Sequence, residues 1–427
     1  MTMQRRDFLK FAGASLAGAL ASASAHAKPS SGRPHIVIVG AGFGGATCAK
    51  YIRMWDPTIK VTLIESNAQY FSCPMTNWVL GGLRTMEETV QSYKNLPGYG
   101  INMVHDTVIG VDTDKRSVTT KDGKKIAYDR LVLAPGIEFM TDLIEGYAEG
   151  EAAGKVLHAW KQGPTLATSQ ATLLKKQLEA MPDGGVFVIA SPPPPGRCVS
   201  GPYERACMVA HYFKQHKPKS KIIMLDGHFD VVSKGPMFKK AWKKYYAGMI
   251  DHRPYNLVTK VDHKSMIVTS EFEDVKADVI NIVPKQRAGA ICKLAGVRAD
   301  SAGVWCPVNG ITYESPKVPF VHVLGDSVAS NMPKSAHVSN NQAKICAAAL
   351  VEMYNDREPN SYPIIGSTSY SATSDHTSGP IAVVMRYDPD KEAYIRQPGG
   401  GASEDSDEIN FEYNKTWFDH IWADTFA

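Results

Sequence analysis

The sequence predicts an α/β protein with two Rossmann-like three-layer nucleotide-binding domains and a C-terminal α+β domain. Three observations predict it: a buried strand that runs into a glycine-rich turn near the N-terminus, a second series of alternating strands and helices in the middle of the chain, and an apolar strand ending in Gly-Asp before a long helical pattern. Strands that alternate with helical segments are typical of parallel sheets covered by helices.

The first element is an apolar strand at residues 35–39, followed by the turn GAGFGG at residues 40–45. In this GxGxxG pattern Gly40 permits the tight turn, Gly42 lets the backbone approach a pyrophosphate, and Gly45 lets the next helix pack closely. The helical pattern at 46–54 would place its N-terminus at the phosphates. Glu65 lies about 20 residues further on, where a carboxylate accepts hydrogen bonds from ribose hydroxyls. Together these features predict a dinucleotide cofactor.

The next elements return the chain to the same sheet. Residues 118–128 predict a hairpin around the turn KDGK, and residues 130–136 predict another parallel strand. Far downstream, the apolar strand 320–326 ends at Asp326, and a helical pattern covers residues 335–354. A carboxylate just past such a strand can hold the ribitol hydroxyls of a flavin. An aspartate that only caps a turn is the alternative, and it is less favoured once all three pieces occur in this order.

The middle of the chain predicts a second α/β unit: strands at 186–189 and 221–225, helices at 203–214 and 237–249, and further strands to residue 282. This is the two-nucleotide-domain plan of flavoprotein disulfide reductases, of the glutathione-reductase type. The loop ASPPPPGR at 190–197 follows its first strand. A nicotinamide site would need glycines there, whereas four prolines remove N–H donors and stiffen the path. We therefore expect no NAD(P)H binding.

The N-terminus has the features of a twin-arginine export signal. QRRDFLK at residues 4–10 precedes a run of small apolar residues, and AHA at 25–27 is an A-x-A cleavage site. The run is short and alanine-rich, so a permanent membrane span is the less favoured interpretation. We expect a mature chain that begins near Lys28 and is located in the periplasm. The net charge of +4 is mild, and the lysine clusters at 214–221 and 239–244 are expected to be solvated helix ends rather than a nucleic-acid or membrane patch.

The sequence holds seven cysteines, an odd number. Helical, alanine-rich contexts predict that three of them are buried packing residues: Cys48, Cys207 and Cys346. The other four have loop-like or strand-end surroundings: Cys73, Cys198, Cys292 and Cys306. There is no CxxCH motif and no zinc-like spacing, so we expect neither a c-type haem nor a metal on this chain.

Over essentially the whole mature chain, the sequence resembles the flavoprotein subunit of flavocytochrome c sulfide dehydrogenase and, more distantly, sulfide:quinone oxidoreductase. The motifs that carry this resemblance are the glycine-rich turn and the segments at 71–77, 81–82, 132–138, 197–205, 278–289, 305–308, 325–326 and 333–335. The predicted domains are a signal peptide at 1–27, a discontinuous FAD-binding domain at 28–155 and 285–355, a second Rossmann-like domain at 156–284 without a nicotinamide site, and a C-terminal interface domain at 356–427.

The resemblance implies a covalent flavin. In that family FAD is joined through its 8α carbon to a cysteine in the segment that matches residues 71–77, which makes Cys73 the candidate; a structural thiol is the alternative. The matched segments also make Ala134 and Gly136 candidate cofactor contacts. Lys334 and Ser335 resemble the region that faces the pyrimidine end of the flavin, where a positive helix terminus stabilises the reduced anionic ring.

The resemblance also implies a redox disulfide above the flavin, which sulfide attacks. Cys198 matches one partner, but Ser369 stands where the second cysteine is expected, and serine cannot form a disulfide. Cys306 matches a family cysteine outside the redox pair. Glu204 matches an acidic residue that would shuttle protons or raise the pKa of Cys198, with a carboxylate that only stabilises a helix N-terminus as the alternative. Trp417 matches a family aromatic residue, which core packing explains equally well.

The leading functional hypothesis is a periplasmic FAD enzyme that oxidises sulfide or a related reduced sulfur compound. It would pass electrons to a c-type cytochrome, either a cytochrome subunit or a soluble cytochrome c. One alternative is a family relative with a changed, non-sulfur or larger substrate, because Ser369 replaces the second cysteine. Another is a flavin electron carrier that docks redox partners without substrate chemistry. A quinone reductase is less favoured, because the tail from residue 410 has no clear amphipathic helix for a membrane surface.

Overall fold

Two five-stranded parallel sheets organise the chain, which a computed structural model describes over residues 32–299 and 302–427. The first sheet has the order β20 (Val321–Val323), β9 (Arg130–Leu133), β1 (His35–Val39), β2 (Lys60–Ile64), β5 (Ile101–Val104). The predicted α/β fold is confirmed. The predicted signal peptide and its cleavage site lie outside the described residues.

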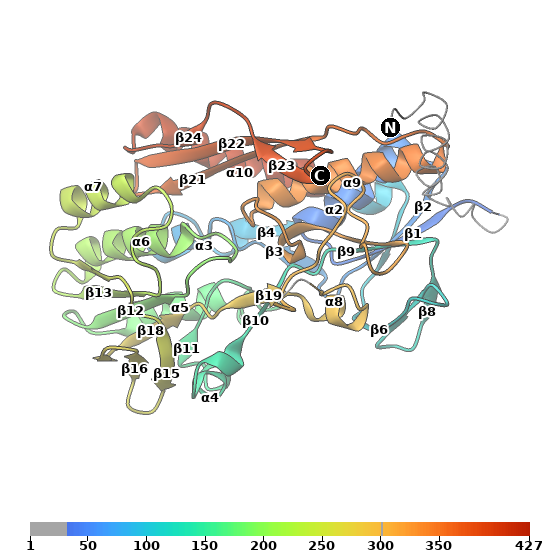
Figure 1. Ribbon diagram of the computed structural model, residues 1–427. Coiled ribbons are helices and arrows are strands. Elements are labelled where there is room, and N and C mark those ends of the chain that lie inside the picture. Colours follow the sequence, from blue (N-terminus) through green and yellow to red (C-terminus); the bar gives the residue numbers. More distant parts are fainter. Residues whose placement is uncertain (1–31, 300–301) are drawn as a thin grey trace, which may run out of the picture. The chain divides into compact units, whose positions relative to one another are not determined.

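The glycine-rich turn connects the centre of the first sheet to a helix. β1 lies between β2 and β9, so its apolar side chains are buried on both faces. α2 (Phe43–Trp55) follows the turn and packs beside α9 (Ala336–Tyr354), as Figure 1 shows. A Cβ atom at Gly45 would lie 1.7 Å from the carbonyl oxygen of Gly40. The close packing predicted for this position is therefore present, and it excludes every other residue type.

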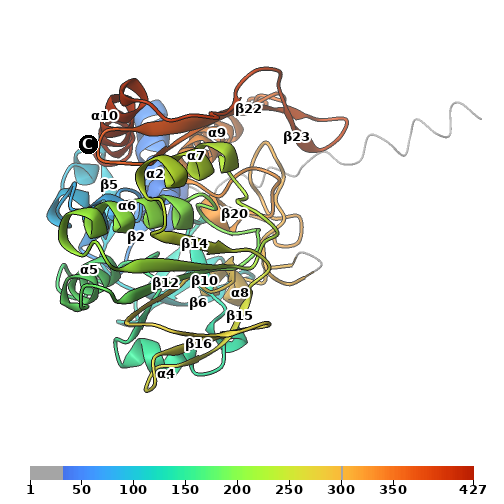
Figure 2. The same ribbon diagram turned by 90° about the vertical axis from the view of Figure 1, so that its left-hand side faces the viewer.

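The second sheet has the order β11 (Val156–Leu157), β18 (Val279–Ile282), β12 (Val186–Ser191), β13 (Lys221–Asp226), β14 (Ile250–Arg253). Its two faces are covered differently, as Figure 2 shows. Phe187 and Ile189 belong to the core that includes α6 (Gly201–His216), whereas Val188 packs with the antiparallel sheet of β15 (Val258–Asp262), β16 (Ile267–Ser270) and β17 (Asp274–Lys276). The alternation follows from the two-residue period of a strand.

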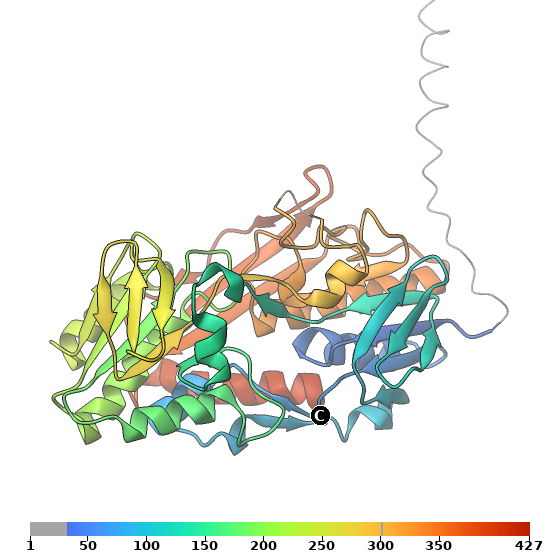
Figure 3. The same ribbon diagram turned by 90° about the horizontal axis from the view of Figure 1, so that it is seen from below.

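Two short strands mark where the chain leaves and rejoins the first sheet. β10 (Ile137–Phe139) follows β9 and pairs antiparallel with β19 (Gln286–Ala288), which comes after the second sheet. The first sheet is completed only afterwards, by β20. The predicted hairpin is present as β7 (Ser117–Thr120) and β8 (Lys125–Ala127), and β6 (Val108–Asp112), which was not predicted, adds a third strand. Figure 3 shows this sheet in teal and β15–β17 in yellow.

The C-terminal residues form an antiparallel sheet and a long helix: β21 (Ile364–Ala372), β22 (Ser378–Asp388), β23 (Ala393–Arg396), β24 (Gly401–Ala402) and α10 (Glu408–Phe426). The remaining elements are α3 (Thr76–Gly81), α4 (Tyr147–Ala152), α5 (Gln170–Ala180), α7 (Gly235–Tyr245), α8 (Ala290–Leu294), β3 (Gln69–Phe71) and β4 (Val90–Ser92). Among the described residues, no helix combines the length and the apolar character needed to cross a bilayer.

Two local predictions need correction. The helix predicted to end at residue 249 ends at Tyr245, because the chain turns at Gly248, which has a φ of +78°, and then enters β14. Cys292 was predicted in a loop-like or strand-end position, but it lies in the short helix α8 and is fully buried. The predicted burial of Cys48, Cys207 and Cys346 is confirmed.

Candidate functional site

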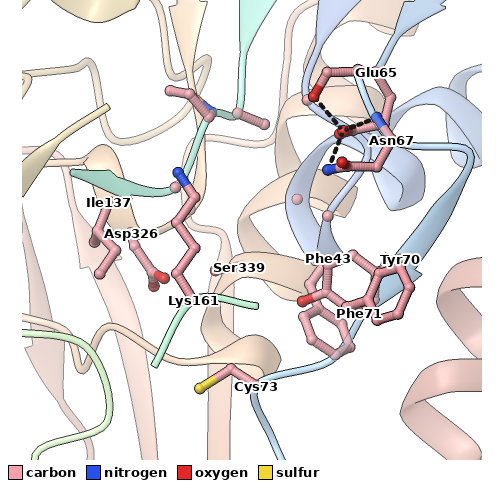
Figure 4. Close-up of a pocket in the computed structure, with 18 of the residues that line it drawn as sticks. Phe43, Glu65, Asn67, Tyr70, Phe71, Cys73, Ile137, Lys161, Asp326 and Ser339 are labelled. Carbon is pink, nitrogen blue, oxygen red and sulfur yellow. Dashed lines mark hydrogen bonds between the residues drawn. The ribbon is translucent and has the colours of Figure 1, made fainter. Parts of the chain in front are cut away.

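A cavity of about 340 Å³ opens at the carboxyl ends of β1, β2 and β9. Most of the predicted cofactor residues line it: Gly40, Gly42, Glu65, Cys73, Ala134, Gly136, Asp326 and Ser335. Figure 4 shows how several of them surround the space. Gly45 does not line the cavity, because it acts one layer below, where α2 packs on the turn. Ligands of parallel α/β sheets bind at this edge, so the position agrees with a nucleotide site.

Glu65 supports the glycine-rich turn. Its Oε2 accepts from the backbone N–H of Ala41 at 2.9 Å. Its Oε1 accepts from the backbone N–H of Asn67 at 3.0 Å (Figure 4). The carboxylate is therefore held at the rim of the cavity, where its remaining lone pairs can accept from hydroxyl groups. Its ribose contact remains a prediction.

Asp326 presents an unsatisfied oxygen to the cavity. It follows β20 and is 8% exposed, and its Oδ1 has no hydrogen-bond partner among the described residues. Burial raises the pKa of this carboxyl, while the charges of Arg197 and Lys334 oppose the rise. A buried acceptor without a donor is unfavourable, and a hydroxyl donor would satisfy it. The residues present therefore fit the ribitol chain of a flavin.

Ser335 and Lys334 have different positions. Ser335 lines the cavity and caps α9, because its side chain accepts from the backbone N–H of Val338 at 3.3 Å. The ammonium of Lys334 instead donates to the carbonyl oxygens of Asp326, at 2.9 Å, and Val328, at 2.6 Å. Lys334 is not among the residues that line the cavity. It holds the loop that carries Asp326, whereas we expected it beside the cofactor.

A smaller pocket of about 50 Å³ adjoins the cavity. The residues that line both spaces and form their common wall are Cys73, Pro74, Trp160, Cys198, Ser335 and Ala336. The pocket also contains Glu204, His337, Ser369, Tyr370, Trp417 and Phe418. The structure thus brings together Cys198 and Glu204, which were predicted as catalytic residues, and places Ser369 in the same pocket.

Cys198 has an unusual backbone conformation and a thiol that resists ionisation. Its φ is +59°, and its N–H donates to the carbonyl oxygen of Lys334 at 3.1 Å. Burial raises the pKa of this thiol to about 12; the charges of Cys73 and Glu204 add to the rise, and the guanidinium of Arg197 opposes it. The thiol is therefore protonated at neutral pH, even though α6 begins at Gly201, close behind it.

All seven cysteines are free thiols in the structure. Cys306 is fully buried and lies beside Cys292, whose thiol hydrogen-bonds to it and, together with burial, raises the pKa of Cys306. Neither of these two residues lines the pocket that contains Cys198. The Cys198 thiol has Cys73 and Ser369 as pocket neighbours instead.

Glu204 lies in the first turn of α6, as the helix-dipole alternative requires, but its carboxylate also reaches the pocket. Its Oε2 accepts from Asn77 Nδ2 and its Oε1 accepts from the backbone N–H of Ala372, both at 2.9 Å. Burial raises the pKa of Glu204, and these two donors oppose the rise. The side chain is therefore fixed between α3 and β21, where it can take up or release a proton next to Cys198.

Arg205 is a site residue that the sequence did not reveal. It is 1% exposed, and its guanidinium connects three segments around the pocket. Its donors reach Asn77 Oδ1 at 3.0 Å, the carbonyl oxygens of His158 and Ala159 at 2.9 and 2.8 Å, and Asn281 Oδ1 at 2.9 Å. Its place at the end of the matched segment 197–205 was the available signal, but a single arginine in a helix does not show that its side chain points inward.

At the equivalent edge of the second sheet, a cavity of about 190 Å³ lies at the ends of β12 and β18, but the carboxylate at the end of β13 is engaged by its own neighbours. Asp226 ends β13, where a carboxylate would hold the ribose of a dinucleotide. It is 1% exposed and already accepts from Tyr203 Oη at 2.7 Å, pairs with His252 Nε2 at 3.0 Å, and accepts from the backbone N–H of His228 at 3.1 Å. This engagement agrees with the proline-rich loop in disfavouring a nicotinamide nucleotide.

Three family models match the chain in separate segments. Residues 34–174 match the pyridine nucleotide-disulphide oxidoreductase model, residues 171–284 match the central part of the flavoprotein chain of sulfide dehydrogenase [flavocytochrome c], and residues 362–426 match the flavin-binding part of flavocytochrome c sulphide dehydrogenase. These matches cover the second sheet, the first sheet except β20, and the C-terminal segment that forms one side of the pocket.

Two curated relatives agree with these matches. The flavoprotein chain of sulfide dehydrogenase [flavocytochrome c] from Chlorobaculum thiosulfatiphilum is 50% identical over 48 residues, which are 11% of this chain and 100% of that sequence. Mitochondrial sulfide:quinone oxidoreductase from Mus musculus is 25% identical over 313 residues, covering 70% of this chain and 66% of that protein. The chain thus spans just under two thirds of the mouse relative's length.

Among solved structures, the fold is similar to that of sulfide:quinone oxidoreductase from the hyperthermophilic bacterium Aquifex aeolicus. The TM-score is 0.72 with 21% identity, and the match covers 92% of each chain. Putidaredoxin reductase, solved as a covalent complex with putidaredoxin, gives a TM-score of 0.65 with 18% identity, over 90% of this chain and 92% of that one. These likenesses confirm the two-sheet fold.

Proposed function

This chain belongs to the flavoproteins of flavocytochrome c sulfide dehydrogenase, and from that premise we propose that it is an FAD-dependent oxidoreductase that oxidises sulfide or a related reduced sulfur compound. We further propose that the electrons pass to a c-type cytochrome, in the periplasm. One observation carries the proposal: the predicted cofactor cavity and the pocket that contains Cys198 and Glu204 share a wall. A small substrate in the pocket would therefore lie next to the cofactor.

Different residues of the large cavity would bind different parts of FAD. The N-terminus of α2 would hold the pyrophosphate, Glu65 the adenosine ribose and Asp326 the ribitol chain. Cys73 would form the thioether, and the α9 N-terminus at Ser335 would face the pyrimidine end. Bound FAD supplies a two-electron acceptor that can be reoxidised one electron at a time.

The pocket residues would prepare the sulfur compound. Glu204, in its ionised form, would accept a proton from the Cys198 thiol or from hydrogen sulfide that enters the pocket, because Glu204 and Cys198 line the same pocket. The Asn77 and Ala372 donors would hold the carboxylate in place during this transfer. The deprotonated sulfur that remains would be the electron donor to the bound cofactor, and the guanidinium of Arg197 would favour its negative charge.

Ser369 favours a second candidate. Its hydroxyl lies in the pocket where a second cysteine would complete a redox disulfide, so attack of sulfide on a Cys198 disulfide to this position is not possible. A family relative with a changed, non-sulfur or larger substrate, or an electron carrier without substrate chemistry, would agree with this residue. If the protein does oxidise sulfide, this pocket permits only slow oxidation that uses the single thiol of Cys198.

Anaerobic reduction of the flavin separates these candidates. We expect sulfide to bleach the visible absorption of the FAD-loaded full chain. We expect a soluble cytochrome c to be reduced when it is added afterwards. Cys198→Ser should lose most of the bleaching rate, while Cys207→Ala, which removes a buried thiol outside both spaces, should keep it. A flavin that sulfide, polysulfide and thiosulfate all leave oxidised would reject sulfur oxidation. Reduction of a soluble quinone but not of the cytochrome would reject the proposed acceptor.

A further inference from the structure

A segment from the second α/β unit forms the wall of the large cavity opposite the glycine-rich turn. We call residues 158–163 the strap. It follows β11, and its residues Trp160, Lys161, Gln162 and Gly163 line the cavity. Figure 4 shows the Lys161 side chain extending into the cavity, with Asp326 and Ile137 near it and Glu65 across the space. No motif in the sequence singles out this lysine.

The strap backbone is held rigidly. Gln170 Oε1 accepts from the N–H groups of His158 and Ala159, both at 2.9 Å. The buried guanidinium of Arg205 donates to the carbonyl oxygens of the same two residues, at 2.9 and 2.8 Å. Trp160 Nε1 donates to the carbonyl oxygen of Arg197 at 3.0 Å. Hydrogen bonds therefore hold the three residues that precede Lys161 in place.

Lys161 brings a positive charge that the described part of the chain does not neutralise directly. No carboxylate of the described residues lies within ion-pair distance of its ammonium. The pKa of Lys161 is lowered, first by burial and then by the charge of Arg197, and the carboxylates of Glu65 and Glu138 oppose the lowering. An anion placed in the cavity would therefore gain from this ammonium.

We propose that Lys161 binds the pyrophosphate of FAD, so that the cofactor is held between the α2 N-terminus on one side and the strap on the other. The inference rests on the proposed FAD site. The covalent order of FAD is adenine, ribose, pyrophosphate, ribitol and flavin ring; with the ribose at Glu65 and the ribitol at Asp326, the pyrophosphate must lie between them. Lys161 reaches into this middle region of the cavity, and it is a single flexible cation suited to a phosphate.

The test compares ligands with and without phosphates. It uses the full chain with Cys73→Ala, so that flavins bind reversibly, and measures dissociation constants for FAD, ADP and riboflavin by fluorescence or calorimetry. We expect Lys161→Met to weaken FAD and ADP binding by about ten- to a hundredfold, the usual effect of losing one charge-assisted hydrogen bond. Riboflavin binding should stay within about twofold, since riboflavin has no pyrophosphate. Lys161→Arg should retain most of the FAD affinity.

Lys155→Met is the matched control, because this exposed lysine lies just before β11 and outside the cavity. Unchanged FAD and ADP affinity in Lys161→Met would overturn the inference. An equal loss for riboflavin would also overturn it, because it would show a general effect of the strap rather than a phosphate contact. If the parent protein with Lys161 intact binds neither FAD nor ADP, the proposed FAD site itself is wrong, and the two failures are thereby distinguished.

Discussion

The backbone N–H of Cys198 donates to the carbonyl oxygen of Lys334 across 3.1 Å, which joins the loop that carries the thiol to the residue just before the N-cap of α9. The thiol is thus positioned by main-chain contacts between two segments that are far apart in sequence. The two side chains have different surroundings: the ammonium of Lys334 donates to the carbonyl oxygens of Asp326 and Val328, whereas Cys198 lines the pocket.

The first prediction concerns the covalent link. Cys73 lines both the cavity and the pocket, so it can reach the edge of a flavin ring. We expect acid precipitation of the FAD-loaded protein to leave the yellow colour with the polypeptide. In Cys73→Ala the colour should move to the supernatant, while Cys198→Ala should keep it in the pellet. Free flavin released from the unsubstituted protein would contradict the assignment.

The second prediction concerns Gly45. Its Cβ would approach the Gly40 carbonyl oxygen to 1.7 Å, which no side-chain adjustment can relieve. Gly45→Ala should therefore displace α2 from the turn and lower the flavin content of the purified protein to about a tenth or less, with a lower melting temperature. Gly82→Ala is a useful comparison, because a Cβ there meets no atom within 4 Å, although its φ of +81° adds some strain. Normal flavin content in Gly45→Ala would show that the packing has been misjudged.

The third prediction concerns the ionisation of Cys198. Its pKa of about 12 is raised in part by the negative charge of Glu204, so removing that charge lowers the pKa and increases the thiolate fraction at a given pH. Glu204→Gln should accelerate alkylation of Cys198 by iodoacetamide at pH 9 by roughly two- to fivefold. Arg197→Met should slow it, because the guanidinium opposes the rise in pKa.

Peptide mass spectrometry identifies which cysteine reacts in this experiment. Both carboxylate oxygens of Glu204 accept from donors, so the NH₂ group of a glutamine must face one of them, and the melting temperature is measured alongside. Glu179→Gln, an exposed substitution in α5, is the control. Slower alkylation in Glu204→Gln would contradict the assigned direction.

The fourth prediction restores the missing partner. Ser369 and Cys198 line the same pocket, so Ser369→Cys should form a disulfide with Cys198 that non-reducing peptide mapping detects. Sulfide-dependent bleaching of the flavin should then increase, by at least several-fold. Ile364→Cys is the control on the same strand, because this exposed residue does not line the pocket. No bridge and unchanged kinetics in Ser369→Cys would reject the alignment of Ser369 with the family cysteine.

The fifth prediction concerns nicotinamide nucleotides. Neither NADH nor NADPH should reduce the flavin, because the loop after β12 lacks N–H donors at its prolines and Asp226 is already engaged by Tyr203 and His252. Anaerobic mixing with either nucleotide, followed at the visible flavin band, tests this. Rapid bleaching would show that this edge of the second sheet accepts a dinucleotide after all.

Local sequence patterns were sufficient for the parts of the site that one segment builds by itself. The strand, turn and helix around Gly40 were predicted in place, because the period of apolar residues and the glycine spacing are both short-range signals. Asp326 was predicted by the same logic, from the apolar strand that precedes it. The pairing of Cys198 with Ser369 in one pocket came from the family resemblance and could not come from spacing.

The missed residues depend on contacts between distant segments. Lys161 reaches the cavity only because Arg205 and Gln170 fix the strap, and no pattern in residues 158–163 encodes those partners. Lys334 was placed beside the cofactor because, with Ser335, it resembles the family region that faces the pyrimidine end of the flavin. Adjacent residues can point in opposite directions, and the ammonium of Lys334 donates to carbonyl oxygens instead. Side-chain direction in irregular segments is set by tertiary packing, which a single sequence does not display.

The wall that Cys73, Trp160 and Cys198 share between the two spaces has an optical consequence. Once FAD fills the larger space, a molecule that enters the smaller one changes the polarity and the aromatic contacts beside the chromophore. The visible band should therefore shift or sharpen on occupancy alone, before any electron moves. Difference spectra of the oxidised holoprotein would then rank inhibitors and poor substrates that never turn over. The flavin absorption would therefore report the binding of compounds next to Cys198.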